Sequence, residues 1–164
     1  MEKIININEN SELIITSFGE CIRDLYLEKM PTVCIISANN APDRHFILPI
    51  IKKIIEIGGK FFVLWGEASD DLHDVIDTII EEGNEEWLNI LTTSHKEEKL
   101  KDVIWFFLKA THFEPEKFRL LALIDDESKE NYKFKEELKK QYSSQPHIHI
   151  GTIDHIPISE STDF

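Results

Sequence analysis

The 164-residue sequence predicts an α/β fold: a three-layer open sheet of about five mainly parallel strands, with helices on both faces. Short, continuous apolar runs alternate along the chain with longer segments in which apolar residues recur at helical spacing. The apolar runs lack polar alternation, which is typical of parallel strands covered on both faces. Five strands in a domain of this length favour the flavodoxin-like order 2-1-3-4-5.

The middle of the chain shows the pattern most clearly. The apolar run FFVLW at 61–65 predicts a buried strand. Ser69 or Asp70 can cap the next helix, because a short side-chain oxygen accepts hydrogen bonds from the first helical turn. Gly83 is the expected end of that helix, and a second strand is expected at 88–92. Such a strand–helix–strand unit has a right-handed crossover.

The rest of the chain extends the alternation. Residues 1–12 are polar with three isoleucines, and they form either a loose arm or an edge strand. Pro49 lies inside an apolar stripe capped by Asp43, so that helix starts late or bends. The remaining helices are expected over 17–29, 43–57, 96–109 and 129–142, and the remaining strands at 33–37, 118–124 and 146–151. Residues 152–164 form a polar tail, and without repeats or a linker the chain 1–164 is expected to be one domain.

Composition excludes several classes of protein. An apolar fraction of 41% excludes a mostly disordered chain. No apolar run approaches the roughly 20 residues that span a bilayer, and the N-terminus lacks the pattern of a signal peptide. With only Cys21 and Cys34, a cytoplasmic protein with buried thiols is expected. The net charge of −13 argues against nucleic-acid binding and permits a basic protein partner.

Familiar cofactor and catalytic motifs are absent from the sequence. There is no GxxxxGK[ST] phosphate loop, no GxGxxG dinucleotide motif and no GxSxG nucleophile turn. The loop after the strand at 33–37, SANNAPD, lacks the glycine of a flavodoxin phosphate loop. No cofactor is therefore expected.

A small-molecule site, if present, would lie beyond the carboxyl ends of the strands, where open α/β sheets bind ligands. Five loops meet there in the predicted fold and form a polar rim. The rim residues are Ser37, Asn39, Asn40 and Asp43; Trp65, Glu67 and Asp70; Thr92, Thr93, Ser94 and His95; Asp125 and Asp126; and Gly151, Thr152 and Asp154.

His95 is the candidate catalytic residue in this rim. As a general base it could pair with Ser94, Glu97 or Asp70. A surface or helix-capping histidine is the alternative. The Thr92–His95 segment could likewise be purely structural, with its hydroxyls capping the helix at 96–109.

His147 and His149 are weak candidates for a metal site. They alternate in the predicted last strand and would face the same side. Imidazole is a common metal ligand, but two ligands do not complete a site.

The acidic face of the central helix is the second candidate surface. The outer face carries Asp70, Asp74, Asp77 and Glu81, and none of them has a basic partner at position i+4, so they would repel one another. Residues 66–102 hold twelve Asp/Glu and three Lys, so −9 of the net −13 lies in this segment. Trp87 lies in the same region and is either a binding anchor or part of the core. The face is either an ordinary solvated surface or a docking surface for a basic partner.

The segments FFVLWG, DDLHDVID, LTTSH and WFF carry a resemblance. Together they resemble an uncharacterised bacterial α/β domain family with a Trp-Gly strand end, an acidic helix, a Thr-Thr-x-His turn and a Trp-Phe pair. The resemblance covers about residues 33–124, and it implies no activity. The matching positions are Trp65, Gly66, Asp74, Asp77, Thr92, Thr93, His95, Trp105 and Phe106.

Two functions are compatible with these features. The first is a non-enzymatic acidic binding module. Its specific form would be an immunity-type protein that neutralises a basic toxin such as a nuclease. The alternative is a small-molecule or nucleotide-sensing domain, or a hydrolase-type enzyme, that uses the rim at Asn39, Trp65, Thr92, Thr93 and His95. A deep pocket with these side chains converging favours the alternative, and a filled rim favours the binding module.

Overall fold

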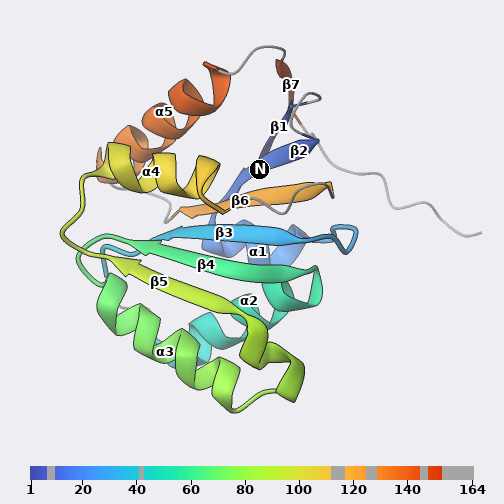
Figure 1. Cartoon of the computed structure of the whole chain (residues 1–164), viewed down its shortest axis with the longest axis vertical. Helices are drawn as coiled ribbons and strands as arrows, with labels where there is room; N and C mark the ends of the chain where they lie inside the picture. The colour runs from blue at the N-terminus through green and yellow to red at the C-terminus, as the bar shows by residue number, and fades with distance from the viewer. Residues whose placement is uncertain (7–9, 41–42, 112–116, 125–128, 145–147, 153–164) are drawn as a thin grey trace, which may run out of the picture.

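The chain folds around one seven-stranded sheet of order β5-β4-β3-β6-β2-β1-β7 (Figure 1). The computed structural model describes residues 1–6, 10–40, 43–111, 117–124, 129–144 and 148–152. The strands are β1 Glu2–Asn6, β2 Ser11–Thr16, β3 Thr32–Ser37, β4 Gly59–Trp65, β5 Leu91–His95, β6 Phe118–Ile124 and β7 Ile148–Thr152. The helices are α1 Phe18–Asp24, α2 Arg44–Glu56, α3 Ser69–Glu81, the short 3₁₀ helix η1 Glu85–Asn89, α4 Leu100–Lys109 and α5 Lys129–Ser143.

The α/β class and the mainly parallel sheet are confirmed, but the strand order differs from the expected 2-1-3-4-5. β4 and β5 both extend the sheet to one side of β3, and β6 pairs with the other side of β3. The five strands from β5 to β2 are parallel, while β1 runs antiparallel to both β2 and β7. After β3, successive strands are first added on one side, as β4 and β5, and then on the other side, as β6, so the strand order reverses between β3 and β6.

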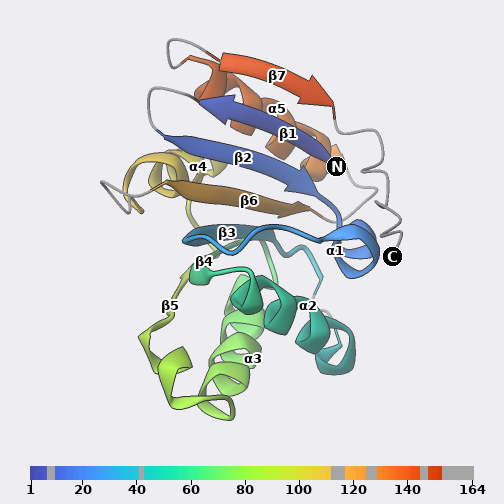
Figure 2. The same cartoon turned by 90° about the vertical axis from the view of Figure 1, so that its right-hand side faces the viewer.

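The helices form two outer layers, as predicted. Figure 2 shows α1, α2 and α3 on one face of the sheet and α4 and α5 on the other. Alternate residues of β3 serve the two cores: Cys34 and Ile36 pack under α1–α3, whereas Val33 and Ile35 pack under α4 and α5. A strand with two buried faces explains the continuous apolar run at 33–37. No helix in the described part of the chain is long and apolar enough to cross a membrane.

The N-terminal hairpin contains a strand that the sequence did not indicate. Residues 1–12 were expected as an arm or an edge strand, and β1 does lie in the sheet, next to β7. β2 lies between β1 and β6 and is buried at every residue, including the polar Ser11, Glu12 and Thr16. Ser17 then caps α1 and forms a capping box with Glu20, whose carboxylate also pairs with the N-terminal ammonium at 3.0 Å.

Three local expectations need correction. The N-cap of α3 is Ala68 and makes no side-chain hydrogen bond, so neither Ser69 nor Asp70 caps this helix. α1 ends at Asp24 rather than continuing to residue 29. The strand expected at 88–92 lies at Leu91–His95 and is preceded by η1. The other helices and strands lie within a few residues of their expected positions.

A buried ion pair crosses the sheet beneath the hairpin. Arg119 of β6 is 1% exposed, and its Nε donates to Glu12 Oε1 of β2 at 2.8 Å. Its Nη2 also donates to the carbonyl of Glu28 at 3.0 Å. Lys3 Nζ lies 2.6 Å from the second carboxylate oxygen of Glu12. These contacts join β1 and β2 of the hairpin to β6, and Arg119 lies 107 residues beyond Glu12 in the sequence.

Glu12 is expected to make the stability of the protein sensitive to acid. Burial raises the pKa of its carboxyl, but the hydrogen bonds from Lys3 and Arg119 outweigh burial, so the pKa lies below the ordinary value of 4.5. A lowered folded-state pKa stabilises the fold above the unfolded pKa, and this contribution disappears as the pH falls through the folded pKa. In urea titrations the stability difference between wild type and Glu12→Gln should be largest above pH 4.5 and shrink at lower pH. A difference that does not change with pH would contradict this.

Candidate functional site

The outer side of α3 and the edge strand β5 form one connected surface. We call it the α3–β5 surface and define it as Asp70, His73, Asp74, Asp77, Thr92 and Ser94. α3 buries Leu72, Ile76, Ile79 and Ile80 against the sheet, so its acids at i, i+4 and i+7 face outward. Asp74 is the most open of these carboxylates, with 88% of its side chain exposed.

Thr92 connects β5 to two side chains of α3. Its Oγ1 donates to Asp77 Oδ1 at 2.5 Å and lies 3.2 Å from His73 Nε2. His73 Nδ1 lies 3.3 Å from the other oxygen of Asp77. Because a carboxylate only accepts, the Thr92 proton points to Asp77, and His73 must donate to the hydroxyl oxygen. The hydroxyl is thereby held in a closed ring, not directed at the imidazole as an activated nucleophile would be.

Ser94 makes the second connection between the two elements. Its Oγ donates to Asp70, and it lies 3.1 Å from the hydroxyl of the fully buried Ser69. Asp70 and Asp77 therefore have structural roles in addition to their charge. Sequence reasoning missed His73, although the spacing of four residues between His73 and Asp77 was a usable signal, and it considered Ser69 only as a helix cap.

The other side of β5 carries His95 and Thr93, which are in contact with each other. His95 Nε2 lies 2.9 Å from Thr93 Oγ1, and the His95 ring packs 5.1 Å from that of Phe106. His95 Nδ1 lies 3.0 Å from Glu98 Oε2 but makes no hydrogen bond within the described residues. Within the described residues His95 shows no contact with the expected partners Ser94, Glu97 or Asp70. Ser94 and Asp70 bond to each other on the opposite face of the sheet.

The predicted rim does not converge on one point. Trp65, at the end of β4, donates from Nε1 to the carbonyl of Glu98 and packs 5.9 Å from Phe134, on the α4–α5 side. Thr92 lies on the α3 side, so the sheet separates it from Trp65, Thr93 and His95. The Thr92–His95 segment is a strand, and α4 begins after Lys99 without a side-chain cap, so these hydroxyls do not cap α4.

Asn39 lies beyond the end of β3, with its side chain near Gly66, where an added Cβ would meet Asn39 Oδ1 at 3.2 Å. Its Nδ2 is buried and makes no hydrogen bond within the described residues. Nearby in sequence, Ser37 donates to Asn131 Oδ1 of α5 at 3.1 Å. Two other rim positions, Asp125 and Asp126, lie outside the described residues, as does Asp154.

Trp87 lies at the opposite, amino-terminal edge of the strands. It belongs to η1, is half-buried, and packs over Gly83, where an added Cβ would meet the indole ring at 2.0 Å. Together with Gly59 and Ile90 it lines a pocket of about 340 Å³. Trp87 is thus a partly buried side chain at the other end of α3 from Asp70.

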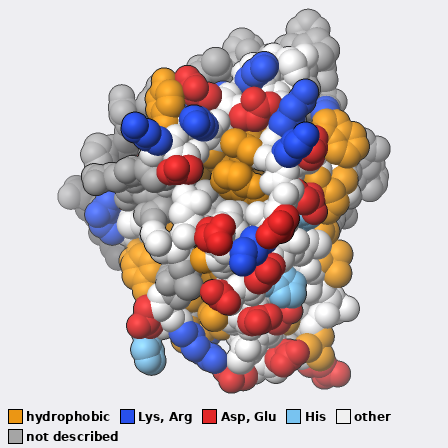
Figure 3. All heavy atoms as spheres, turned by 90° about the vertical axis from the view of Figure 1, so that its left-hand side faces the viewer, with side chains coloured by type: hydrophobic (Ala, Val, Ile, Leu, Met, Phe, Trp, Pro, Cys, Tyr) orange, Lys and Arg blue, Asp and Glu red, His pale blue; other side chains and the backbone are white. Residues whose placement is uncertain are grey.

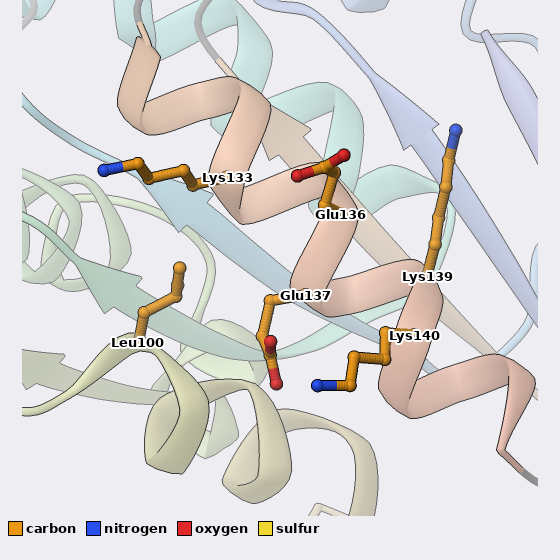
Figure 4. Close-up of a pocket in the computed structure, with 6 residues that line it drawn as sticks. All are labelled: Leu100, Lys133, Glu136, Glu137, Lys139 and Lys140. Atoms are coloured by element: carbon orange, nitrogen blue, oxygen red, sulfur yellow. The ribbon is translucent and has the colours of Figure 1, made fainter.

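A larger, open pocket of about 640 Å³ lies between α4 and α5. Figure 4 shows that its lining comes from Leu100 of α4 and from five charged residues of α5. This lining contains three lysines and two glutamates, so it presents no single sign of charge. None of the predicted rim residues lines it.

Charge is unevenly distributed on the face that the carboxyl ends of the strands reach. Figure 3 shows most of the Lys and Arg side chains of this face in its upper half, mixed with some acids, and most of the Asp and Glu side chains in its middle and lower parts. Within the described residues, no Lys or Arg pairs with the acids at 70, 71, 74, 77 or 81 of α3; the nearby Arg44 pairs with Glu82. The acidic row therefore carries an uncompensated negative field.

The metal candidates lie where little is described. His147 is outside the described residues, and His149 lies in β7, for which only the backbone is described. Among the described side chains, no group of three or more His, Cys, Asp or Glu residues could hold a metal ion.

A family model described as a domain of unknown function (DUF7684) matches residues 20–145, more than half of the chain. The chain belongs to the DUF7684 family. This confirms the expected membership of a family without a known activity. The DUF7684 match runs from α1 to the residues after α5 and includes the whole α3–β5 surface. No curated protein matches the chain.

Proposed function

We propose that this protein is a non-enzymatic binding module whose α3–β5 surface, together with the exposed acids Asp71 and Glu81 of α3, docks a basic protein. The observation that supports the proposal most directly is the row of α3 carboxylates, which has no Lys or Arg partner in the described part of the chain. Like charges at this spacing on a helix repel one another. A basic partner would relieve the repulsion and would be attracted over a long range.

The specific form that we propose is an immunity-type protein that acts in the cytoplasm and neutralises a basic toxin, such as a nuclease. A nuclease needs a basic surface in order to bind the phosphates of its substrate. An acidic helix docked on that surface would compete with the nucleic acid for the same Lys and Arg side chains. The net charge of −13 is compatible with this kind of inhibition.

The structure guides the choice of residues for the test. Asp70 and Asp77 bond to β5, so reversing their charge would disturb the fold as well as the surface. Asp71, Asp74 and Glu81 are exposed on the same helix, and their side chains make no hydrogen bond or ion pair with Lys or Arg among the described residues. The triple variant Asp71→Lys/Asp74→Lys/Glu81→Lys is therefore the test variant.

The matched control is Glu28→Lys/Glu56→Lys/Glu130→Lys, whose positions are exposed on other parts of the surface. Each exchange of an acid for Lys changes the charge by +2, so the net charge is −7 in both variants and −13 in the wild type. Wild type, test variant and control are each used to capture proteins from an extract of the native cells. The captured partner is then purified and its affinity for each form is measured by calorimetry.

The expected result is a basic protein that binds wild type and control alike and binds the test variant at least about 100-fold more weakly. This factor is realistic because close charge pairs across an interface contribute about 1.5–7 kcal/mol. If the two triple variants lose affinity equally, net charge rather than this surface is responsible, and the proposal is wrong. If the captured partner is a nuclease, its activity should fall on addition of the wild type only.

The rim at Asn39, Trp65, Thr92, Thr93 and His95 is the alternative site, for a small molecule or for hydrolytic chemistry. It receives less support because these side chains divide between the two faces of the sheet. None of these five side chains lines either of the two pockets described above. We therefore favour the binding module.

A further inference from the structure

β5 is an open edge of the sheet. It is the last strand on its side, and it pairs only with β4. Within the described residues, no other backbone–backbone hydrogen bond reaches residues 91–95. Every second residue of such a strand directs its N–H and C=O away from the sheet, where they can pair with an added strand. The sequence LTTSH contains none of the lysines or prolines that commonly protect an edge.

The two sides of this edge differ in chemistry. Thr92 and Ser94 face α3, so a strand added beside β5 would place alternate side chains next to the acids of the α3–β5 surface. On the other side lies Leu91, which is 58% exposed, and Leu88 of η1 is 61% exposed just before the strand. The edge is thus acidic on one side and offers uncovered apolar surface on the other.

Charge argues against a second copy of the chain as the occupant. Antiparallel pairing of β5 with β5 of another copy would bring two unneutralised acidic helices together. With a net charge of −13 on each copy, that approach is repulsive. A positively charged segment meets the opposite situation, because the same acids attract it.

We propose that β5 binds an extended basic segment of the partner as an eighth strand of the sheet. The segment alternates basic side chains, directed to the acids of α3, with apolar side chains that cover Leu91. The backbone of β5 supplies hydrogen bonds, and the two flanks supply the selectivity for sequence, as in other cases of strand addition. This inference rests on the proposed function and adds the part of the partner that is recognised and its conformation.

Synthetic peptides test this inference on the intact chain. The probe is a short peptide of alternating Lys and Val, and its control has the same composition with the lysines and valines in separate blocks. In two further versions of the alternating peptide, backbone nitrogens carry methyl groups: either those of all Lys residues or those of all Val residues. Only one of these sets can face β5, because successive residues of a strand point their N–H groups to opposite edges. Binding is followed by calorimetry and by the amide resonances of residues 91–95.

Strand addition predicts that the alternating peptide binds at least tenfold more tightly than the block peptide and shifts the amide resonances of β5. One N-methylated version should lose binding and the other should keep it. If block and alternating peptides bind equally and both N-methylated versions bind, strand addition is wrong, while a charge-based function of the surface remains. If no peptide binds with a dissociation constant below about 1 mM, strand addition is also wrong, and the capture experiment tests the proposed function separately.

The Asp71/Asp74/Glu81 reversal variant separates the two proposals further. It should bind the alternating peptide at least tenfold more weakly than wild type and the matched control do. The alternating peptide could instead bind all three proteins equally, shift the amide resonances of β5 and lose binding in one N-methylated version. That result would support strand addition and would show that the α3 acids have no role in it.

Discussion

Replacing Arg119 with Met is expected to lower the free energy of unfolding by about 3–5 kcal/mol, the usual cost of removing one partner from a buried ion pair. Arg119 is fully enclosed, and its guanidinium bonds to Glu12 and to the carbonyl of Glu28. Without it, Lys3 is the one partner that the buried carboxylate of Glu12 keeps among the described residues. The lost contact to Glu28 also releases the segment between α1 and β3, so the hairpin and the central strands lose a common anchor.

Urea denaturation should show this as a lower midpoint with an unchanged slope. Arg23→Met is the matched control, because Arg23 lies on the surface with only a long contact to Asp24, and it should change stability by less than about 0.5 kcal/mol. Adding Glu12→Leu to the Arg119 variant should recover part of the loss, since no unpaired buried charge then remains. Equal effects of the Arg119 and Arg23 exchanges would show that the buried pair has no special role.

Gly58→Ala is expected to destabilise the protein by about 3 kcal/mol, from backbone strain of about 1–3 kcal/mol together with a steric clash of similar size. Gly58 has a φ of +107°, a conformation that residues with a Cβ rarely adopt. An added Cβ would lie 2.0 Å from the backbone oxygen of Met30. The turn cannot simply move, because Thr32 N donates to Gly58 O and Met30 N donates to Ile57 O.

Gly19→Ala provides the comparison for this exchange. Gly19 lies in α1, and an added Cβ would meet no atom within 4 Å. The same chemical change should there stabilise the protein by about 0.5–1 kcal/mol, because Ala favours the helix. Thermal unfolding of the two variants beside wild type is the measurement. A Gly58→Ala protein as stable as wild type would show that the α2–β4 turn tolerates a different backbone path.

Only part of the site could be predicted from the sequence, and the reason is physical. The acids Asp70, Asp74 and Asp77 were found because charged residues on the outer side of an apolar helical stripe must face water. Their contacts to Thr92 and Ser94 were not found, because the sequence does not state which hydroxyl groups a neighbouring strand brings to that helix. His95 was assigned the wrong partners because the position of β5 was displaced by about three residues. A one-residue shift already moves a side chain to the other face of a sheet.

The displacement of β5 has its own cause. The apolar residues near 88–92 predicted a buried strand, but Leu88 and Leu91 are exposed and only Ile90 is buried among them. The strand that forms instead, LTTSH, is held by pairing to β4 and by hydrogen bonds to α3. Tertiary contacts, rather than apolar burial, determine its position.

Local patterns were sufficient to predict the α/β class, the central strands β3, β4 and β6, and the amphipathic helices, since each of these buries a continuous run or a periodic stripe of apolar residues. The strand order and the place of β2 depend instead on contacts between distant parts of the chain. β2 buries Ser11 and Glu12, whose partners Tyr142 and Arg119 are 131 and 107 residues away. Burial of a polar residue is stable only when such a partner is present, and a local pattern carries no record of residues so far along the chain.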